Sequence, residues 1–235
     1  MFFFAENILE TCVLPPDESL HCVRVLRLKE NDRVQIIDGK GNLYEAKIVF
    51  ADAKNTRVEI LSVQKEFEKR SYSMHLAIAP TKNIERLEWC IEKAVEIGVD
   101  VITPLLCRYS ERKIVKPERL EKIIVAAAKQ SIKAYMPKLN PLINFNDFVL
   151  QSTENQRFIA HCCTTEKQLL SKICKKELST LVMIGPEGDF SLEEVIFAEN
   201  KGVVSVSLGQ SRLRTETAGL VACDTVALIN NLSFG

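Results

Sequence analysis

The sequence lacks the features of several large classes of protein. No apolar run approaches the ~18–20 residues that a membrane span needs, so no membrane-spanning segment is predicted. Residues 1–6 contain no basic segment followed by a long apolar stretch, and we therefore expect no signal peptide.

Metal-binding and disulfide patterns are also missing. Eight cysteines are present, but no two of them form a Cys-x-x-Cys pair, and there are only three histidines. Because zinc ligands usually occur as closely spaced pairs, no metal site is predicted. Without an export signal, we expect the cysteines to be reduced thiols of a cytoplasmic protein.

The charge balance excludes a further class of protein. Lys and Arg number 31, as do Asp and Glu, so the net charge is zero and a polycation that coats nucleic acid is not expected. Apolar residues make up 46% and charged residues 26% of the chain, as in globular proteins rather than disordered or collagen-like ones. A length of 235 residues allows one large domain or two modest ones.

The first 70 residues follow the two-residue period of β-strands. Residues 33–37 are predicted to form a short strand, residues 38–41 a turn, and residues 17–26 a helix with Asp17 as its N-cap. Several short strands with one helix predict a small β-barrel. The apolar positions that alternate with polar ones are Tyr44, Ala46, Ile48, Phe50, Val58 and Ile60.

The spacing of apolar residues changes at residues 64–73, which are polar and charged. We interpret this stretch as a linker; the alternative is a loop within one domain. From residue 74 onward, apolar runs alternate with segments of helical period, which predicts a parallel sheet with helices on both faces. The expected strands are 75–79, 101–105, 158–162, 181–184 and 203–208, and the expected helices are 83–97, 117–131, 166–174, 191–201 and 217–230.

The last of these helices is apolar on nearly all sides. Between residues 218 and 229 its only charge is Asp224. A helix of this composition must be buried on most of its surface. We expect one face in the domain core and another in a dimer.

A glycine-containing turn follows the predicted strand at 181–184. Its sequence is Gly185-Pro186-Glu187-Gly188, and the helix after it has Ser191 as N-cap and Glu194 in position for a capping box. Open α/β sheets bind ligands at the carboxyl ends of their strands. The alternative interpretation is a tight turn without a ligand. The turn matches neither the P-loop nor the dinucleotide-binding pattern, which argues against a nucleotide-dependent metabolic enzyme.

Two charged stretches complete the pattern. Residues 208–218 lie between the next strand and the last helix, and contain Arg212, Arg214 and Glu216 between apolar flanks. Residues 108–138 contain nine Lys or Arg against three Glu, as expected of a face that contacts phosphates. Either stretch is also consistent with ordinary solvated surface.

The motifs together resemble the RsmE family, which methylates N3 of uridine in small-subunit ribosomal RNA and belongs to the SPOUT superfamily. The resemblance rests on Gly-Pro-Glu-Gly at residues 185–188 and on Leu-Arg-x-Glu-Thr-Ala at residues 213–218, with weaker matches along the whole chain. It implies a PUA-like RNA-binding β-barrel at residues 1–70 and a SPOUT α/β methyltransferase domain with a trefoil knot at residues 74–235. It also implies a homodimer that uses S-adenosylmethionine. The alternative is a non-catalytic protein that binds ribosomal RNA.

The resemblance also implies roles for individual residues. Arg214 would stabilise the negative charge that develops on the uracil oxygens. Glu216 would either accept the N3 proton or orient an arginine. The residues expected to bind S-adenosylmethionine are Ile184, Gly185, Glu187, Gly188, Leu208, Gly209, Leu213, Thr217 and Ala218, with the adenine between the two leucines. The residues expected to bind RNA are His21, Arg24, Arg27, Lys82, Arg86, Arg108, Arg112 and Lys113.

The chain departs from the family pattern in two loops. Asp189 stands where a second glycine usually follows Gly-Pro-Glu-Gly. Gln210, Ser211 and Arg212 replace the usual Pro, Arg and Ile. Arg212 therefore competes with Arg214 for the role of the catalytic arginine.

Overall fold

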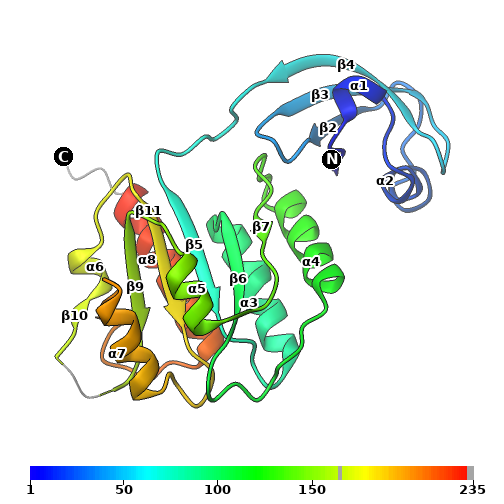
Figure 1. Cartoon of the computed structure of the whole chain (residues 1–235). Coiled ribbons are helices and arrows are strands. Elements are labelled where there is room, and N and C mark those ends of the chain that lie inside the picture. The colour runs from blue at the N-terminus through cyan, green and yellow to red at the C-terminus, as the bar shows by residue number, and fades with distance from the viewer. Residues whose placement is uncertain (164–165, 232–235) are drawn as a thin grey trace. The chain divides into compact units, whose positions relative to one another are not determined.

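The computed structural model describes residues 1–163 and 166–231 (Figure 1). It divides into two compact units. The N-terminal unit contains Met1–Lys69 and Val125–Met136. The C-terminal unit contains Arg70–Ile124 and the described residues from Pro137 onward. Each unit is described by itself below. No helix in the described part of the chain is both long and apolar enough to cross a bilayer.

The N-terminal unit is built on one four-stranded sheet in the order β1-β2-β3-β4. The strand β1 runs parallel to β2, and the remaining pairs are antiparallel. An isolated bridge from Val13 to Arg57 extends the sheet beyond β4. The elements are β1 (Phe2–Phe4), α1 (Ile8–Thr11), α2 (Pro16–Leu20), a π-helical segment (His21–Val25), β2 (Arg33–Ile37), β3 (Leu43–Phe50) and β4 (Arg57–Gln64).

The predicted helix at 17–26 exists, but its details were wrong. It begins at Pro16 with Pro15 as N-cap, so Asp17 lies in the first turn and is not the cap. Pro is favoured at the first helical position, where its missing N–H leaves no donor unpaired. From His21 onward the helix continues with π-type hydrogen bonds, which the apolar period does not reveal.

The predicted turn at 38–41 is organised by a buried carboxylate. Asp38 Oδ1 accepts hydrogen bonds from the backbone N–H of Lys40 and of Asn42, and Oδ2 accepts one from the Tyr44 hydroxyl at 3.0 Å. Burial alone would raise the pKa of Asp38, but a hydrogen bond from the Asn42 side chain to Oδ2, together with these bonds, lowers it. Burial and the neighbouring carboxylate raise the pKa of Tyr44 to about 12.

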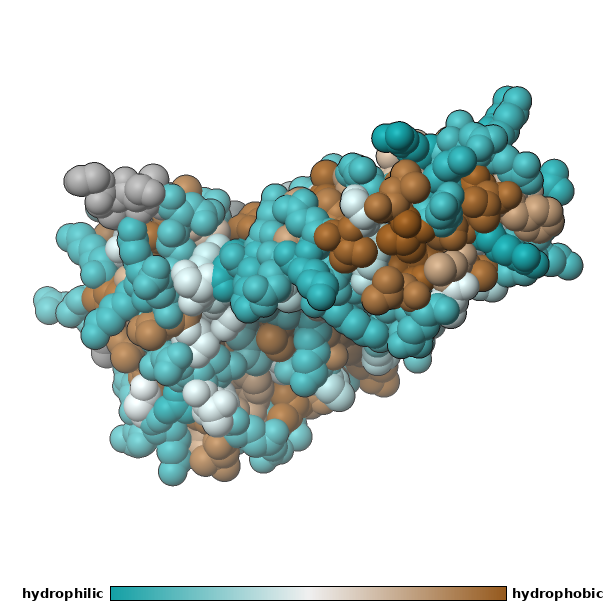
Figure 2. All heavy atoms as spheres, turned by 90° about the horizontal axis from the view of Figure 1, so that it is seen from above, coloured by the Kyte–Doolittle hydropathy of each residue, from teal (hydrophilic) through white to brown (hydrophobic). Residues whose placement is uncertain are grey.

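The strand at 33–37 is confirmed, whereas the alternation in β3 breaks at its end. Ile48 is fully buried, but Phe50 is 46% exposed because the ladder between β3 and β4 shifts register between these residues. Figure 2 shows hydrophobic side chains gathered on one face of the N-terminal unit. The exposed large hydrophobic side chains of β3 and β4 are Val49, Phe50, Leu61 and Val63.

The C-terminal unit contains the predicted parallel sheet. The strand order is β10-β12-β9-β11-β5-β6-β7, with β8 also paired to β6, and every pairing within the described residues is parallel. The strands are β5 (Ser73–Ile78), β6 (Val101–Leu106), β7 (Lys138–Leu139), β8 (Ile143–Asn144), β9 (Gln156–Ala160), β10 (Gln168–Leu169), β11 (Ser179–Ile184) and β12 (Val204–Ser207).

Helices cover both faces of this sheet, as predicted. Ala77 packs with α5 and α7, while Leu76 and Ile78, which point to the opposite face, lie against α8. Figure 1 shows α5 and α7 on one side of the sheet and α3 and α8 on the other. The helices are α3 (Ile84–Ile97), α4 (Pro117–Gln130, shared between the two units), α5 (Phe145–Gln151), α6 (Leu170–Ile173), α7 (Leu192–Asn200) and α8 (Thr215–Asn231).

The helix predicted at 166–174 was wrong. Gln168 and Leu169 are extended and pair with Val206 and Ser207 at the edge of the sheet, which leaves only the single turn of α6. No side chain caps the start of this turn. The backbone hydrogen bonds of the sheet therefore replace those of a longer helix.

One arginine holds two helices at their C-terminal ends. The Arg157 guanidinium donates to the carbonyl of Ser152, which follows α5, and to the carbonyl of Lys201, which follows α7. The last carbonyls of a helix have no partner within it. Both helix C-termini are thus tied to the amino end of β9, and α7 begins at the opposite, carboxyl edge of the sheet.

A buried polar chain crosses the sheet near its amino edge. His75 Nδ1 lies 2.5 Å from Glu154 Oε1, and His75 Nε2 lies 2.7 Å from Thr103 Oγ1. Thr103 Oγ1 also accepts a hydrogen bond from Asn140 Nδ2. Burial alone would raise the pKa of Glu154, but the hydrogen bond and charge of His75 lower it below its ordinary value of 4.5.

We expect Glu154→Ala to lower the free energy of unfolding at pH 7 by about 1.5–3 kcal/mol, because a buried charge-assisted hydrogen bond is lost. A depressed carboxylate pKa contributes stability above the unfolded-state pKa, and this contribution disappears as the pH falls through the folded-state value. Urea unfolding at pH 7 and pH 3 measures both effects. Exposed Glu121→Gln is the control, and an equal loss at both pH values would contradict the assignment.

Candidate active site

The two predicted loops meet at the carboxyl edge of the sheet. Thr215 Oγ1, at the start of α8, donates a buried hydrogen bond of 3.1 Å to the carbonyl of Gly185, which directly follows β11. This bond joins segments that are 30 residues apart in the chain. The two loops therefore meet as expected, whereas their role as one site stays a prediction.

The first turn is tightly packed and has the predicted helix start. A Cβ at Gly185 would lie 3.1 Å from the backbone nitrogen of Phe190, so a larger residue there would have to displace this backbone by a few tenths of an ångström. Ser191 Oγ accepts from the Glu194 N–H, and Glu194 Oε2 accepts from the Ser191 N–H, which completes the capping box. Glu194 Oε1 also accepts from the N–H of Arg108, so one carboxylate connects α7 to the loop after β6.

Asp189, at the position of the usual second glycine, adopts the left-handed backbone conformation with φ = 66°. Asp tolerates this region better than most residues because its short side chain can hydrogen-bond locally. Its Oδ1 accepts from the Phe190 N–H, and its Oδ2 accepts from the Cys162 N–H at 2.7 Å. The substitution therefore ties the turn to the end of β9.

The second loop presents open backbone and two half-buried leucines. Gly209 has φ = 137°, and a Cβ placed there would meet no atom within 4 Å. Leu208 and Leu213 are half-buried on either side of this exposed stretch. The Ser207 hydroxyl bonds both the N–H and the carbonyl of Gly209, so what this loop offers a flat heteroaromatic ligand is the open space at the Gly209 Cα beside apolar side chains. The side chains of Arg212 and Arg214 are exposed and make no hydrogen bond or ion pair within the part of the chain that the structure describes.

Glu216 is buried, with 6% of its surface exposed. Its Oε1 lies 3.8 Å from Arg86 Nε, whereas Oε2 is buried without a hydrogen-bond partner among the described residues. The arginine that it meets is therefore Arg86 of α3, and neither Arg212 nor Arg214. Burial and the charge of Glu216 raise the pKa of the Cys90 thiol, also on α3, to about 12.

The loop after β5 completes the edge; Lys82 in this loop was predicted to bind RNA, but the contacts that hold the loop were not predicted. Arg112 Nε and Nη2 donate to the carbonyls of Thr81 and Lys82 at 3.0 and 2.7 Å. The backbone N–H of Lys82 donates to Glu187 Oε1 at 2.9 Å. Arg112 and Glu187, predicted to contact RNA and S-adenosylmethionine, thus hold the loop after β5 in place. Nothing in the sequence pattern signals these contacts, because they join segments that are 30 and 105 residues apart.

The other predicted RNA-binding residues are divided between the two units, and Arg108 and Lys113 lie in the C-terminal one. Arg108 is exposed and forms an ion pair of 3.0 Å with exposed Glu193, a type of contact that contributes little to stability. Lys113 is exposed and makes no polar contact with any described residue. His21, Arg24 and Arg27 lie in the N-terminal unit, at or just after its π-helical segment.

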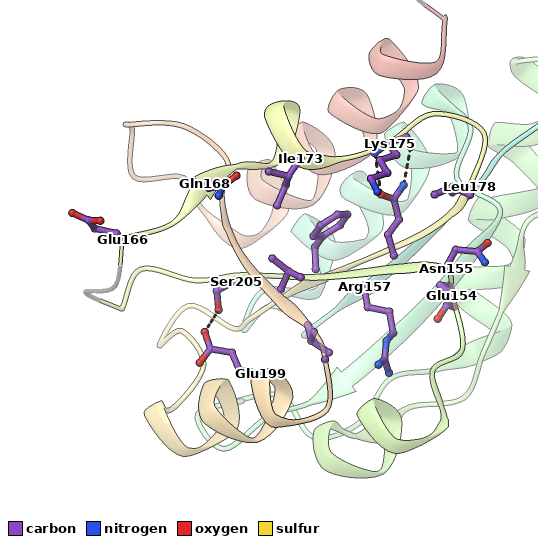
Figure 3. Close-up of a pocket in the computed structure, with 15 residues that line it drawn as sticks. Glu154, Asn155, Arg157, Glu166, Gln168, Ile173, Lys175, Leu178, Glu199 and Ser205 are labelled. Atoms are coloured by element: carbon purple, nitrogen blue, oxygen red, sulfur yellow. Dashed lines mark hydrogen bonds between the residues drawn. The ribbon is translucent and has the colours of Figure 1, made fainter.

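A separate cavity of about 820 Å³ lies at the amino ends of β9 and β12 (Figure 3). Its lining side chains are partly committed to each other. Ser205 donates to Glu199 at 2.6 Å, and Gln156 and Lys175 are joined by two hydrogen bonds. None of the predicted site residues lines this cavity.

Comparison with known proteins agrees with this arrangement of sheet and loops. The model of the RNA methyltransferase domain matches residues 68–227, and the model of the RNA methyltransferase PUA domain matches residues 14–61. A two-domain RNA methyltransferase with a PUA-like domain is therefore the class that the chain represents.

Individual relatives are more specific. A probable rRNA-methyltransferase from Porphyromonas gingivalis is 39% identical, with a TM-score of 0.91 over 97% of this chain and 98% of that one. Ribosomal RNA small subunit methyltransferase E from Neisseria gonorrhoeae, solved bound to S-adenosyl methionine, is 26% identical, with a TM-score of 0.82 over 94% of each chain. The protein of that name from Rickettsia conorii is 30% identical over 93% of this chain and 90% of its own length. The chain belongs to the ribosomal RNA small subunit methyltransferase E family.

Proposed function

We propose that the protein transfers a methyl group from S-adenosylmethionine to N3 of a uridine in 16S ribosomal RNA, in the cytoplasm. The observation that carries this proposal is the hydrogen bond from Thr215 to Gly185, which joins two ligand-type loops into one site in a chain of this family. The names of the relatives and the cofactor bound in the Neisseria gonorrhoeae structure support the same reaction.

The residues of the two loops fit the cofactor. Leu208 and Leu213 are half-buried apolar side chains suited to the faces of an adenine ring, and the backbone at Gly209 is open in front of its Cα. When bound, S-adenosylmethionine supplies an electrophilic methyl group on a sulfonium. The predicted contacts of Ile184, Gly185, Gly188, Thr217 and Ala218 belong to the same proposal.

Arg214 and Glu216 are assigned to the chemistry. The Arg214 guanidinium is free to form a planar fork to a uracil oxygen, where negative charge develops as the N3 proton leaves. Glu216 holds Arg86 through Oε1 and has an unpartnered Oε2 that is available to accept this proton. The target base must be unstacked to reach these groups.

The finer architecture is part of the proposal. We infer a PUA-like barrel at residues 1–70, supported by the Val13–Arg57 bridge beyond β4. A trefoil knot in the domain at 74–235 would be an exception to the rule that chains do not thread themselves. It is supported by the path of the chain, which leaves β12 beyond β9 and returns to place Gly219 of α8 against Ile78 and Cys90. Exposed Leu228 on α8 and Trp89 on α3 support a homodimer through this face.

Nucleoside mass spectrometry of 16S ribosomal RNA tests the function. We expect N3-methyluridine to be absent at one position in cells that lack the protein, and to return when purified protein and S-adenosylmethionine are added to their small subunits. An unchanged nucleoside profile would contradict the proposal. The non-catalytic alternative predicts in addition that titration with S-adenosylmethionine gives no binding heat.

A further inference from the structure

Tyr109 stands at the edge of the site without a role in the proposed reaction. Tyr109 is 49% exposed and lies beside the exposed Gly188 of the turn after β11. A Cβ at Gly188 would lie 3.0 Å from Tyr109 Cβ, so the side chain starts directly on the Gly-Pro-Glu-Gly turn. Glycine at 188 therefore leaves room for Tyr109 to stand against the turn that we assign to the cofactor.

The loop that carries Tyr109 is held at both ends. The Arg108 N–H donates to Glu194 of the capping box, and Arg112 is fixed on the carbonyls of Thr81 and Lys82. Between them, the buried Ser110 hydroxyl accepts from the Cys107 N–H at 3.0 Å. A ring presented by so constrained a backbone loses little conformational entropy when a ligand stacks on it.

Four basic side chains surround the ring, two of which are paired with carboxylates: Arg108 with Glu193, and Lys82 with Glu111. The Arg108 guanidinium carbon lies 5.8 Å from the centroid of the Tyr109 ring. A hollow of about 500 Å³ on the same loop is lined by Lys82, Arg112 and Lys113 together with Glu111 and Ile114. An exposed aromatic face flanked by positive charge matches the way in which proteins bind single-stranded nucleic acid, with phosphates on cations and bases on rings.

We propose that Tyr109 is a stacking platform for an unpaired base of the RNA substrate, next to the site of methyl transfer. The proposal rests on the proposed function for the identity of the RNA, but base stacking itself needs no methyl transfer. Lys113 supplies a phosphate contact beside the platform, and Arg112 positions the loop.

Binding of short RNA to Tyr109→Leu and Tyr109→Phe tests the platform. The probes are a single-stranded oligouridine and an abasic oligonucleotide of the same length. We expect Tyr109→Leu to weaken oligouridine binding by roughly ten- to hundredfold, the usual loss for one stacked base, and to leave abasic binding unchanged. Tyr109→Phe keeps the ring and should bind like the wild type. The affinity for S-adenosylmethionine should be the same in all three proteins.

Lys113→Ala is the matched control for charge. It should weaken both probes and reduce the salt dependence of binding by about 0.7 units of slope, whereas Tyr109→Leu should leave that slope unchanged. Equal losses on both probes, or a loss of cofactor affinity in Tyr109→Leu, would show that the ring only packs on Gly188 and would overturn the proposal. A wild-type protein that binds oligouridine as expected but methylates no RNA would overturn the proposed function and leave the platform intact.

Discussion

Arg214→Ala should lower the single-turnover rate of methylation by about 10²–10³-fold, the usual cost of removing one preorganised donor to a developing negative charge. The Arg214 side chain is exposed and uncommitted to other described residues, so its removal breaks no contact of the resting fold. The affinity for S-adenosylmethionine should change little. Rapid-quench assays with saturating cofactor, together with calorimetric titration, measure the two quantities separately.

Arg212→Ala is the control for this experiment, because Arg212 is equally exposed and lies two residues away in the same loop. It should retain most of the rate. If Arg214→Ala lost cofactor affinity and rate in equal measure, the residue would be part of the pocket wall. If only Arg212→Ala reduced the rate, the family register would be wrong in this loop.

Gly209→Val should abolish detectable binding of S-adenosylmethionine without unfolding the protein. The φ of 137° at this position is rarely adopted by any residue with a side chain, and a β-branched residue is the most restricted. Valine would therefore move the loop backbone, although its Cβ meets no neighbouring atom in the structure. Calorimetric titration measures binding, and thermal unfolding checks the fold.

Gly202→Ala serves as the matched variant, since Gly202 also has positive φ but lies in the turn after α7, near the amino end of β12. It should lose some stability and keep its affinity for the cofactor. Unchanged binding in a folded Gly209→Val protein would place the cofactor elsewhere.

The sequence predicted those helices and strands that are marked by the period of their apolar residues and by residues at their ends. The helix α3 runs from its Asn83 cap to Gly98, whose φ of 115° ends it, and so agrees within one residue with the helix predicted at 83–97. The strand β1 was missed because Phe2–Phe4 has no polar residue between its apolar ones and so shows no period. The helix α5 was missed because it has only seven residues, too few for a periodic signal.

For the candidate site, the positions of the loops were predictable and the partners of the charged side chains were not. Glycines and caps placed both loops at strand ends, and the fold brings them together as expected. The partners of charged side chains were not predictable, because Arg86 meets Glu216 across two helices that are distant in sequence. Arg112 is an example. Its place in a basic stretch predicts a phosphate contact, but in the structure its guanidinium donates to the carbonyls of Thr81 and Lys82.

The bond between Thr215 and Gly185 also has a consequence for the order of folding. The bond joins the end of β11 to the start of α8, and the chain between them forms α7 and β12. Loop closure must be completed before such distant contacts contribute stability. A nascent chain that ends before residue 215 can therefore build most of the sheet without a donor pocket. At the cofactor site proposed above, binding of S-adenosylmethionine would therefore report that the chain has folded as far as α8.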